Sequence, residues 1–418
     1  KGRAVKLRLD LRAAPLAVLA SLLALAVVAR MRARPHVHAE TSAQAAAEVD
    51  AGSPTIGSAV QAGRATSAPI RMQHGDRRRC AREAVRGPSR LSVKWKAAGL
   101  GAIEAQPIPS PDASTIYVAS LGGDLIALAR QDGKVRFRVP RCGRIFASPC
   151  GDARGYVYAA SDAKKVFAID PKGEIAWTLE VDGEADTACA LADDGTIVLA
   201  AGSTLYGITP NGTVAWRFAA KGKIFTAPAI DDRGRVFVGS QDHRVYGVDR
   251  GQKAFAVDLG GDVDGSPAID DDGNVVVGTD YDEVVKLDAG GSVLWSAHVG
   301  GFVRGPISIA RGGDVLAGVY GPWSRVVRLD GKTGKDVGSF TVPGTGALEF
   351  GVHGGPLEDA AGQLYFGAQD DRLYAIDSHG KTMFTLQTGG DVDAPPTLLS
   401  DGALVVASDD GAVYYLDP

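Results

Sequence analysis

A unit of about forty residues repeats along most of the chain, and no other feature limits the fold as strongly. Each unit opens with a proline, or once a cysteine, at the start of a short apolar run, and the spacings between openings are 42, 40, 39, 39, 39, 50 and 39 residues. A period of this length is typical of folds that stack one small structural unit on the next. The openings are Pro107, Pro149, Cys189, Pro228, Pro267, Pro306, Pro356 and Pro395.

Each unit contains four short β-strands. In residues 265–295, GSPAI, NVVVGT and EVVKLD are three β-rich runs separated by Asp- and Gly-rich turns, and the fourth run ends at Trp295. Alternating β-branched and aromatic residues between such turns indicate strands. Eight units of four strands predict an all-β, eight-bladed β-propeller over residues 91–418.

The ends of the repeat predict how the ring closes. The eighth unit stops at Asp417-Pro418 after its third strand, and an unassigned strand, SVKW (92–95), precedes the first unit. We expect this N-terminal strand to complete the last blade, because closure leaves no free sheet edge.

Most units place an aromatic residue four positions after a turn glycine. Large rings at equivalent positions bury apolar area between neighbouring blades, so we predict a docking role for them. The sixth unit has Gly338 at this position, with Phe340 nearby. The predicted docking residues are Trp95, Phe137, Trp177, Trp216, Phe255, Trp295 and Phe384.

The N-terminal part differs in charge from the rest. Residues 1–94 carry 17 Lys+Arg and 6 Asp+Glu, a net charge of +11, whereas the remainder carries 28 and 43, a net charge of −15. Within the first part, residues 1–12 form a basic n-region and residues 13–29 an uninterrupted apolar run. As a helix this run would reach roughly 25 Å, a little short of a bilayer core of about 30 Å.

Two interpretations of residues 13–29 stay open, a cleaved signal peptide and an uncleaved signal anchor, and the arginines that follow the run favour the anchor. Heavier positive charge before the run keeps that side in the cytoplasm. We therefore expect the body on the periplasmic side of the inner membrane, or periplasmic or secreted if the signal is cleaved.

Two segments separate the apolar run from the propeller. Residues 30–70 are rich in small and polar residues and predict a flexible linker. Residues 71–90 contain seven arginines and form a basic lead-in. Its charge suits contact with the acidic body; a nucleic-acid patch is the alternative, which export disfavours.

The repeat resembles the quinoprotein-type (PQQ-like) propeller family, whose blades carry the pattern A-x-D-x-x-T-G-x-x-x-W. The most similar copies are AIDPKGEIAW (168–177), KLDAGGSVLW (286–295) and RLDGKTGKDV (328–337), and the resemblance covers about residues 72–418. The family includes two kinds of protein, so the resemblance implies two alternative functions. One is that of the PQQ-dependent dehydrogenases, and the other is that of the BamB-type subunits of the outer-membrane β-barrel assembly machinery.

The dehydrogenase function implies a tryptophan floor, a vicinal cysteine pair, calcium ligands and a catalytic aspartate. No two of the four cysteines are adjacent, no CxxCH haem motif occurs, and one short insertion leaves little chain for a lid. We therefore predict a non-catalytic scaffold without cofactor or metal. A PQQ-dependent alcohol or sugar dehydrogenase with PQQ and calcium, and a polysaccharide- or ligand-sensing propeller, are the alternatives.

Acidic clusters suggest calcium at first sight, but they fall at expected hairpin turns, where Asp and Gly favour tight backbone geometry. We interpret them as turn residues. They are DDRG (231–234), DDDGN (270–274), QDD (369–371) and SDDG (408–411).

The cysteines suit an oxidising compartment. Cys142 and Cys150 are separated by an expected strand of about 26 Å, too far for a bond. We predict instead a disulfide between Cys80 and Cys142 that ties the lead-in to the second blade.

Loops between second and third strands share one face with the segments that join successive blades. The insertion TVPGTGALEFGVHGG (341–355) is expected on the same face. Exposed aromatic residues beside charges are typical of an interaction surface, so we predict that envelope proteins bind here. The predicted partner-binding residues are Asp242, His243, Tyr281, Asp282, Trp323, Arg325, His353, Asp370 and Asp371.

Overall fold

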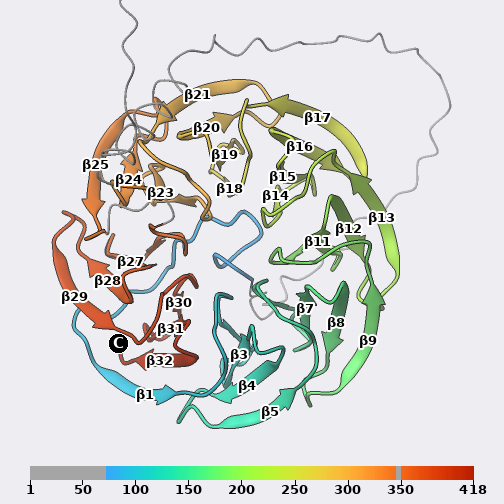
Figure 1. Cartoon of the computed structure of the whole chain (residues 1–418), viewed down its shortest axis with the longest axis vertical. Helices are drawn as coiled ribbons and strands as arrows, with labels where there is room; N and C mark the ends of the chain where they lie inside the picture. The colour runs from blue at the N-terminus through green and yellow to red at the C-terminus, as the bar shows by residue number, and fades with distance from the viewer. Residues whose placement is uncertain (1–71, 345–349) are drawn as a thin grey trace, which may run out of the picture. The chain divides into compact units, whose positions relative to one another are not determined.

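The computed structural model describes residues 72–344 and 350–418, which form an eight-bladed β-propeller (Figure 1). Every blade is a four-stranded antiparallel sheet, and the described residues contain no helix. The predicted all-β, eight-bladed propeller of four-stranded blades is therefore confirmed. The predicted segments 1–12, 13–29 and 30–70 lie outside the described residues, and within the described part no helix could span a membrane.

The strands of a blade follow one another from the axis to the rim (Figure 1). Blade 8 differs in that its outermost strand is β1. Blade by blade, the strands are β2 (Ile108–Pro109), β3 (Thr115–Ala119), β4 (Leu125–Ala129), β5 (Val135–Val139); β6 (Cys150–Gly151), β7 (Val157–Ser161), β8 (Lys165–Ile169), β9 (Ile175–Glu180); β10 (Ala190–Leu191), β11 (Ile197–Ala201), β12 (Thr204–Ile208), β13 (Val214–Ala219); β14 (Ala229–Ile230), β15 (Val236–Ser240), β16 (Arg244–Asp249), β17 (Gln252–Asp258); β18 (Gly265–Ile269), β19 (Val275–Gly278), β20 (Glu283–Leu287), β21 (Val293–His298); β22 (Ser308–Ile309), β23 (Val315–Val319), β24 (Arg325–Leu329), β25 (Asp336–Thr341); β26 (Leu357–Glu358), β27 (Leu364–Ala368), β28 (Arg372–Ile376), β29 (Thr382–Gln387); and β30 (Thr397–Leu398), β31 (Leu404–Ser408), β32 (Ala412–Leu416), β1 (Val93–Ala97).

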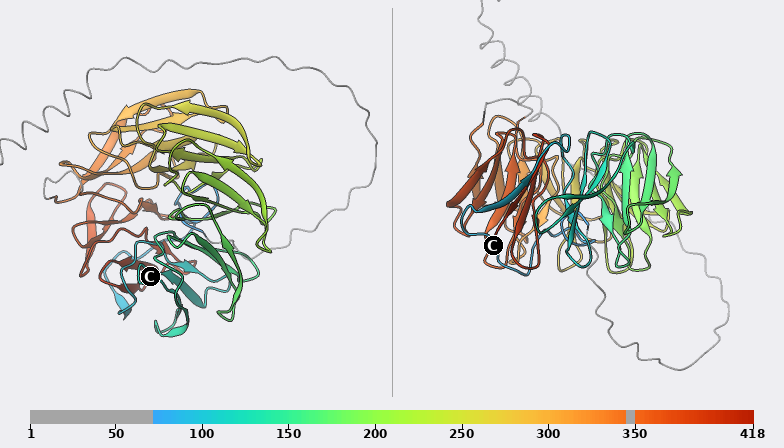
Figure 2. Two further views of the ribbon diagram at one scale, coloured as in Figure 1. Left: turned by 45° about the vertical axis from the view of Figure 1, so that its right-hand side comes forward. Right: turned by 90° about the horizontal axis from the view of Figure 1, so that it is seen from below.

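The strands run between two faces of the propeller, seen edge-on in Figure 2. The turns between first and second strands and between third and fourth strands share one face, here called the turn face. The loops between second and third strands and the segments that join one blade to the next share the other, here called the loop face.

Aspartate side chains fix the hairpin turns of the turn face. The Asp231 carboxylate accepts hydrogen bonds from the backbone N–H groups of Arg233 and Arg235, both at 2.9 Å, and Gly234 follows in a left-handed conformation with φ of 81°. Asp270 makes the same pair of bonds two and four residues ahead. The acidic clusters at 231–234 and 270–274 are thus turns, as interpreted from the sequence.

Neighbouring blades dock through an aromatic ring set against a turn glycine of the next blade. A Cβ atom at Gly173 would lie 2.6 Å from the Phe137 ring, and one at Gly334 would lie 2.6 Å from the Trp295 ring. Only glycine leaves room for this contact, and its φ of 91° or 70° suits the turn as well. Similar pairs are Trp95 with Gly133, Trp177 with Gly212 and Phe255 with Gly291.

The remaining predicted docking residues vary this contact. The Trp216 ring lies against Gly207 of its own blade. In blade 6, Phe340 takes the place of the missing aromatic residue and packs edge-on against Phe366 and Tyr374 of blade 7. Phe384 is buried in a cluster that includes side chains of blade 8.

The fourth strand of blade 8 comes from the N-terminal side of the propeller. β1 pairs antiparallel with β32, Trp95 lies opposite Tyr415, and their ring centres are 5.1 Å apart. The Trp95 indole N–H donates to the carbonyl of Arg130 in blade 1 at 2.8 Å. One residue thus joins the last blade to the first.

The lead-in crosses the centre of the ring, where Figure 1 shows it in blue. The N–H groups of Ile230, Ile269 and Ile309, at the inner strands of blades 4, 5 and 6, donate to lead-in carbonyls at 2.8–2.9 Å. The arginines of the lead-in pair with the acidic turns: Arg77 and Arg78 with Asp232, and Arg82 with Asp271. The lead-in thus lies across the inner strands near the turn face.

The predicted disulfide is wrong. Cys80 and Cys142 are free and buried, and the disulfide joins Cys150 to Cys189, whose Cα atoms are 5.7 Å apart. The two bonded residues are 39 positions apart, which is one repeat, so they occupy neighbouring inner positions of blades 2 and 3. Equivalent positions of adjacent blades approach most closely at the axis.

Peptide mapping under non-reducing conditions should recover Cys150 linked to Cys189. Because the bond closes a loop of about forty residues, its loss in a Cys150→Ala/Cys189→Ala variant should reduce the free energy of unfolding by about 2–4 kcal/mol. Urea unfolding measures the loss. Recovery of a Cys80–Cys142 peptide would contradict the assignment.

Trp95→Ala should destabilise the propeller by about 2–4 kcal/mol, because it leaves a gap between blades 8 and 1. Trp323→Ala is the matched control, since the Trp323 side chain is 69% exposed and should change stability little. Equal losses for the two variants in urea unfolding would show that the ring does not depend on this contact.

Candidate functional site

The segments that lead into the eight blades share a two-residue pattern that builds a site on the axis. The first residue of each pair is aliphatic and buried, with at most 3% exposed. Several of these residues also donate their backbone N–H to the preceding blade, as Ile145 does to Ser120 and Val263 to Ser240, both at 3.3 Å. The buried residues are Ile103, Ile145, Ala185, Ile224, Val263, Val303, Val352 and Val392.

The second residue of every pair lines one shared cavity of about 420 Å³ at the loop face. Neighbouring residues of an extended segment point in opposite directions, so burial of the first directs the second toward the axis. Each blade thus contributes one side chain, and we call this set the axial ring. It comprises Glu104, Phe146, Asp186, Phe225, Asp264, Arg304, His353 and Asp393.

The axial ring is chemically uneven. Blades 2 to 5 present Phe146, Asp186, Phe225 and Asp264, in which aromatic and acidic side chains alternate. Phe225 is 40% exposed, an unusual position for a large apolar ring. Gln73 of the lead-in lines the same cavity. The cavity therefore offers apolar surface and carboxylates side by side, which suits a ligand with apolar and cationic parts.

Burial and crowding disfavour the charged form of several carboxylates here. Burial raises the pKa of Glu104 to about 7, and the carboxylates of Asp409 and Asp393 add to the effect. Burial together with Asp280 raises the pKa of Asp264 to about 6. Titratable groups with shifted pKa values in a cavity are typical of functional sites.

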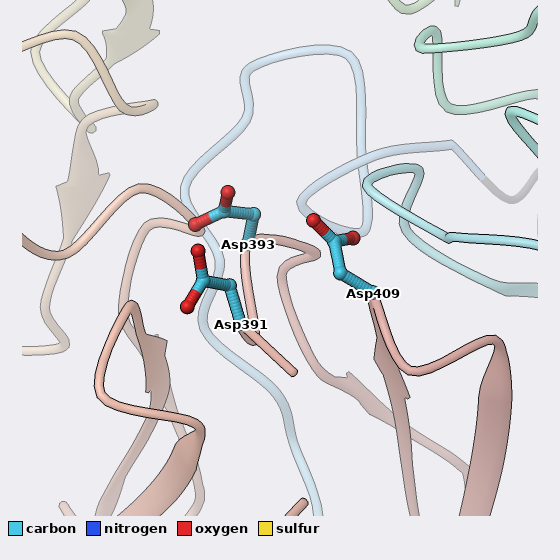
Figure 3. Close-up of side chains that lie close together, drawn as sticks. All are labelled: Asp391, Asp393 and Asp409. Atoms are coloured by element: carbon cyan, nitrogen blue, oxygen red, sulfur yellow. The ribbon is translucent and has the colours of Figure 1, made fainter. Parts of the chain in front are cut away.

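Three carboxylates lie close together, as Figure 3 shows, and one of them, Asp393, lines the cavity. Asp391 and Asp393 lie in the segment that joins blades 7 and 8, and Asp409 lies in the loop between β31 and β32. Each offers an oxygen within 4.8 Å of the others. This set, here called the aspartate cluster, is the group of side chains in the described residues that could hold a metal ion.

The nine residues predicted to bind a partner lie on the loop face, but only His353 lines the cavity. Four of the others shape loops. Asp242 accepts hydrogen bonds from the Tyr246 hydroxyl and the Lys221 N–H, and Asp370 accepts one from the Tyr374 hydroxyl.

The other loop-shaping residues act in the same way. Asp282 accepts bonds from the N–H groups of Val299 and Gly301, and the Asp371 carbonyl accepts one from Thr388. For Asp370 and Asp371 this agrees with the turn role predicted for the cluster at 369–371. For Asp242 and Asp282 the sequence interpretation assigned no such role.

Of the remaining predicted residues, Trp323 and His243 are exposed, and Tyr281 and Arg325 are half-buried. Trp323 is 69% exposed. The His243 imidazole lies 3.3 Å from Asp262, and Arg325 donates to the Val299 carbonyl at 3.1 Å. Tyr281 packs beside Gly261. Trp323 therefore keeps the character of a contact residue.

The sequence interpretation missed seven of the eight residues of the axial ring. The sequence does contain a signal for them. In each unit the axial-ring residue comes directly after a small or aliphatic residue and shortly before the opening proline or cysteine. The interpretation also assigned the cluster at 408–411 to a turn, whereas Asp409 belongs to the aspartate cluster. Asp410 of the same segment does shape the loop, since it accepts a bond from Tyr414.

Comparisons with known proteins match the whole propeller. The model of the family described as outer membrane protein assembly factor BamB matches residues 88–185, 143–254, 242–337 and 322–418. No curated protein sequence matches significantly.

Similar solved structures include BamB from Moraxella catarrhalis, with 17% identity, a TM-score of 0.65, and coverage of 78% of this chain and 100% of that one. They also include the quinohemoprotein alcohol dehydrogenase from Comamonas testosteroni, with 12% identity, a TM-score of 0.70, and coverage of 84% and 80%. The designed protein Ika8 has 15% identity and a TM-score of 0.65, and the coverage is 78% and 99%. Likeness at these identities concerns the fold alone.

Asp264→Asn should alter the pH dependence of stability. The pKa of Asp264 is higher in the folded chain than in the unfolded one, so the stability that its proton contributes is present below about pH 4 and lost as the pH rises through about 6. The variant should match the parent chain at pH 4 and be more stable at pH 8, by at most about 3 kcal/mol.

Urea unfolding at pH 4, 6 and 8 measures this difference. Asp272→Asn, at an exposed turn position, is the control and should show no such trend. Parallel stability curves for Asp264→Asn and the parent chain would contradict the buried position of this carboxyl.

Proposed function

Because the chain belongs to the family of the outer membrane protein assembly factor BamB, we propose that it is a non-catalytic scaffold that binds another protein of the cell envelope. Binding takes place on the loop face. The scaffold acts on the periplasmic side of the inner membrane, in outer-membrane protein assembly.

One observation carries the proposal: the axial ring gathers eight side chains of five different residue types on an otherwise repetitive framework. The repeat keeps its core and turn residues in every blade, but the ring holds acids, a base, an imidazole and two phenylalanine rings. Stability does not call for this variety, since exposed Phe225 and crowded carboxylates are costly. Recognition of a partner explains it.

The loop face has the composition of an interaction surface. Exposed Trp323 and Phe225 can supply apolar anchors, and the surrounding carboxylates can select a partner with positive charge. The turn face is occupied at its centre by the lead-in, whose arginines pair with the turns there. The loop face is therefore the better docking side.

Site-specific photocrosslinking in the native cell tests the proposal. A photoreactive phenylalanine analogue placed at Phe225 or Trp323 should capture the same envelope protein. The matched control is Ile175 on the outer strand of blade 2, which is apolar and 46% exposed. It is the first residue of β9 and therefore lies at the turn-face end of that strand, away from the loop face. It should capture nothing specific.

A variant pair strengthens the test. Phe225→Ala and Trp323→Ala together should reduce capture by a probe at His243 at least tenfold without lowering Tm, because both side chains are exposed. Undiminished capture, or capture from Ile175 as well, would refute the assignment of the loop face.

A second function, a PQQ-dependent dehydrogenase, is favoured by the size of the cavity, which would admit a small molecule. The residues present do not fit that cofactor well. Among the residues that the structure describes, no tryptophan lines the cavity, and the disulfide joins residues 39 positions apart instead of a vicinal pair. With calcium held constant, PQQ should therefore change neither Tm nor dye reduction with alcohols or sugars; turnover would establish the enzyme.

A further inference from the structure

We propose that the aspartate cluster binds a divalent cation, with calcium as the best fit. The three ligands are the carboxylates of Asp391, Asp393 and Asp409, which bridge the segment between blades 7 and 8 and the loop between β31 and β32 (Figure 3). This site goes beyond partner binding and does not depend on it.

The backbone holds the three carboxylates in place without a ligand. The N–H of Asp409 donates to the carbonyl of Asp391 at 2.9 Å, so the two segments are joined directly. Val392, which lies between Asp391 and Asp393 in the sequence, is fully buried and donates its N–H to the carbonyl of Ala368 at 3.2 Å. Asp391 and Asp393 flank this anchor in sequence. A preformed site of this kind costs little ordering on binding.

A buried carboxylate oxygen without a donor points to a missing ligand. The Asp393 side chain is only 9% exposed, and its Oδ1 atom has no hydrogen-bond partner. Its other oxygen accepts a bond from Gln369 at 3.3 Å. The Oδ1 atom of Asp409 is also buried and without a donor. Leaving such atoms unpaired is costly, and a bound cation removes the cost.

The surrounding charges do not neutralise the cluster. Among the side chains of residues 72–344 and 350–418, only His353 lies within ion-pair range, with 3.9 Å from its Nδ1 to Asp393. Glu104 adds a further carboxyl to the lining of the same cavity as Asp393. Excess negative charge in a partly buried position attracts a cation.

The donor chemistry selects the kind of cation. All three ligands are carboxylate oxygens, which suit hard cations, whereas zinc prefers nitrogen and sulfur. Each carboxylate offers an oxygen within 4.8 Å of the others. Small side-chain rotations would bring three such oxygens to the calcium–oxygen distance of about 2.4 Å from one ion. The site opens to the cavity, so water completes the larger coordination shell of calcium. Magnesium demands a stricter octahedron.

Calorimetric titration of the EDTA-treated full chain with calcium, without PQQ, tests the proposal. We expect one saturable site with a Kd of about 10⁻⁵ to 10⁻³ M, tenfold or more weaker binding of magnesium, and a rise in Tm with calcium. Asp391→Asn/Asp409→Asn should weaken calcium binding at least tenfold. The same variant should be at least as stable as the parent chain in EDTA, because it removes repulsion between carboxylates.

The control variant, Asp272→Asn/Glu174→Gln, removes the same number of charges from exposed turns and should bind calcium like the parent chain. Absence of saturable binding by the parent chain at ~10 mM calcium, well above this range of Kd, would overturn the proposal. So would unchanged binding by Asp391→Asn/Asp409→Asn. Equal affinity for magnesium would overturn the assignment to calcium. Tm in EDTA separates a loss of binding from a loss of fold.

Discussion

The contact between an aromatic ring and the turn glycine of the next blade is the interaction on which this structure depends. Within a blade, hydrogen bonds along the strands hold the sheet, but they do not join one sheet to another. The docked rings provide that junction, as Phe137 does against Gly173 and Trp295 against Gly334. The ring closes only where blade 8 docks on blade 1, and Trp95 makes that last junction. A β-sheet with no free edge is the result.

Closure also creates the candidate site. Eight inner segments are brought to one axis, and the alternation of an extended chain sends one side chain from each into the cavity. None of these side chains stands out in its own blade. Glu104 and Asp393 are far apart in the sequence, but they influence each other's environment because blades 1 and 8 are neighbours in the ring. The site is a property of the circle and not of any motif.

The sequence predicts those features of the structure that recur from one unit to the next. The eight blades, the order of the strands and the turn role of aspartates such as Asp231 and Asp270 all follow from local patterns of residues. Contacts between blades are harder to predict, because positions one period apart meet only after the ring has formed. The bond from Cys150 to Cys189, the axial ring and the path of the lead-in belong to this class. Alignment of the eight units, with attention to positions where they differ, would have indicated the axial ring.

Several side chains on the loop face are unfavourable for stability, and ligand binding explains why they are there. A framework selected only for stability would place small or paired polar residues at the axial ring, as the turn face pairs its aspartates with arginines of the lead-in. Instead, Asp264 and Glu104 have raised pKa values and Phe225 is exposed. A ligand that brings positive charge to these carboxylates, or apolar surface to Phe225, removes the unfavourable free energy of their present surroundings. A cation at the aspartate cluster and a partner over Phe225 and Trp323 would relieve different parts of it, since the cluster belongs to blades 7 and 8 and Phe225 to the entry of blade 4. The two halves of the face can therefore act on one partner without competing for the same atoms.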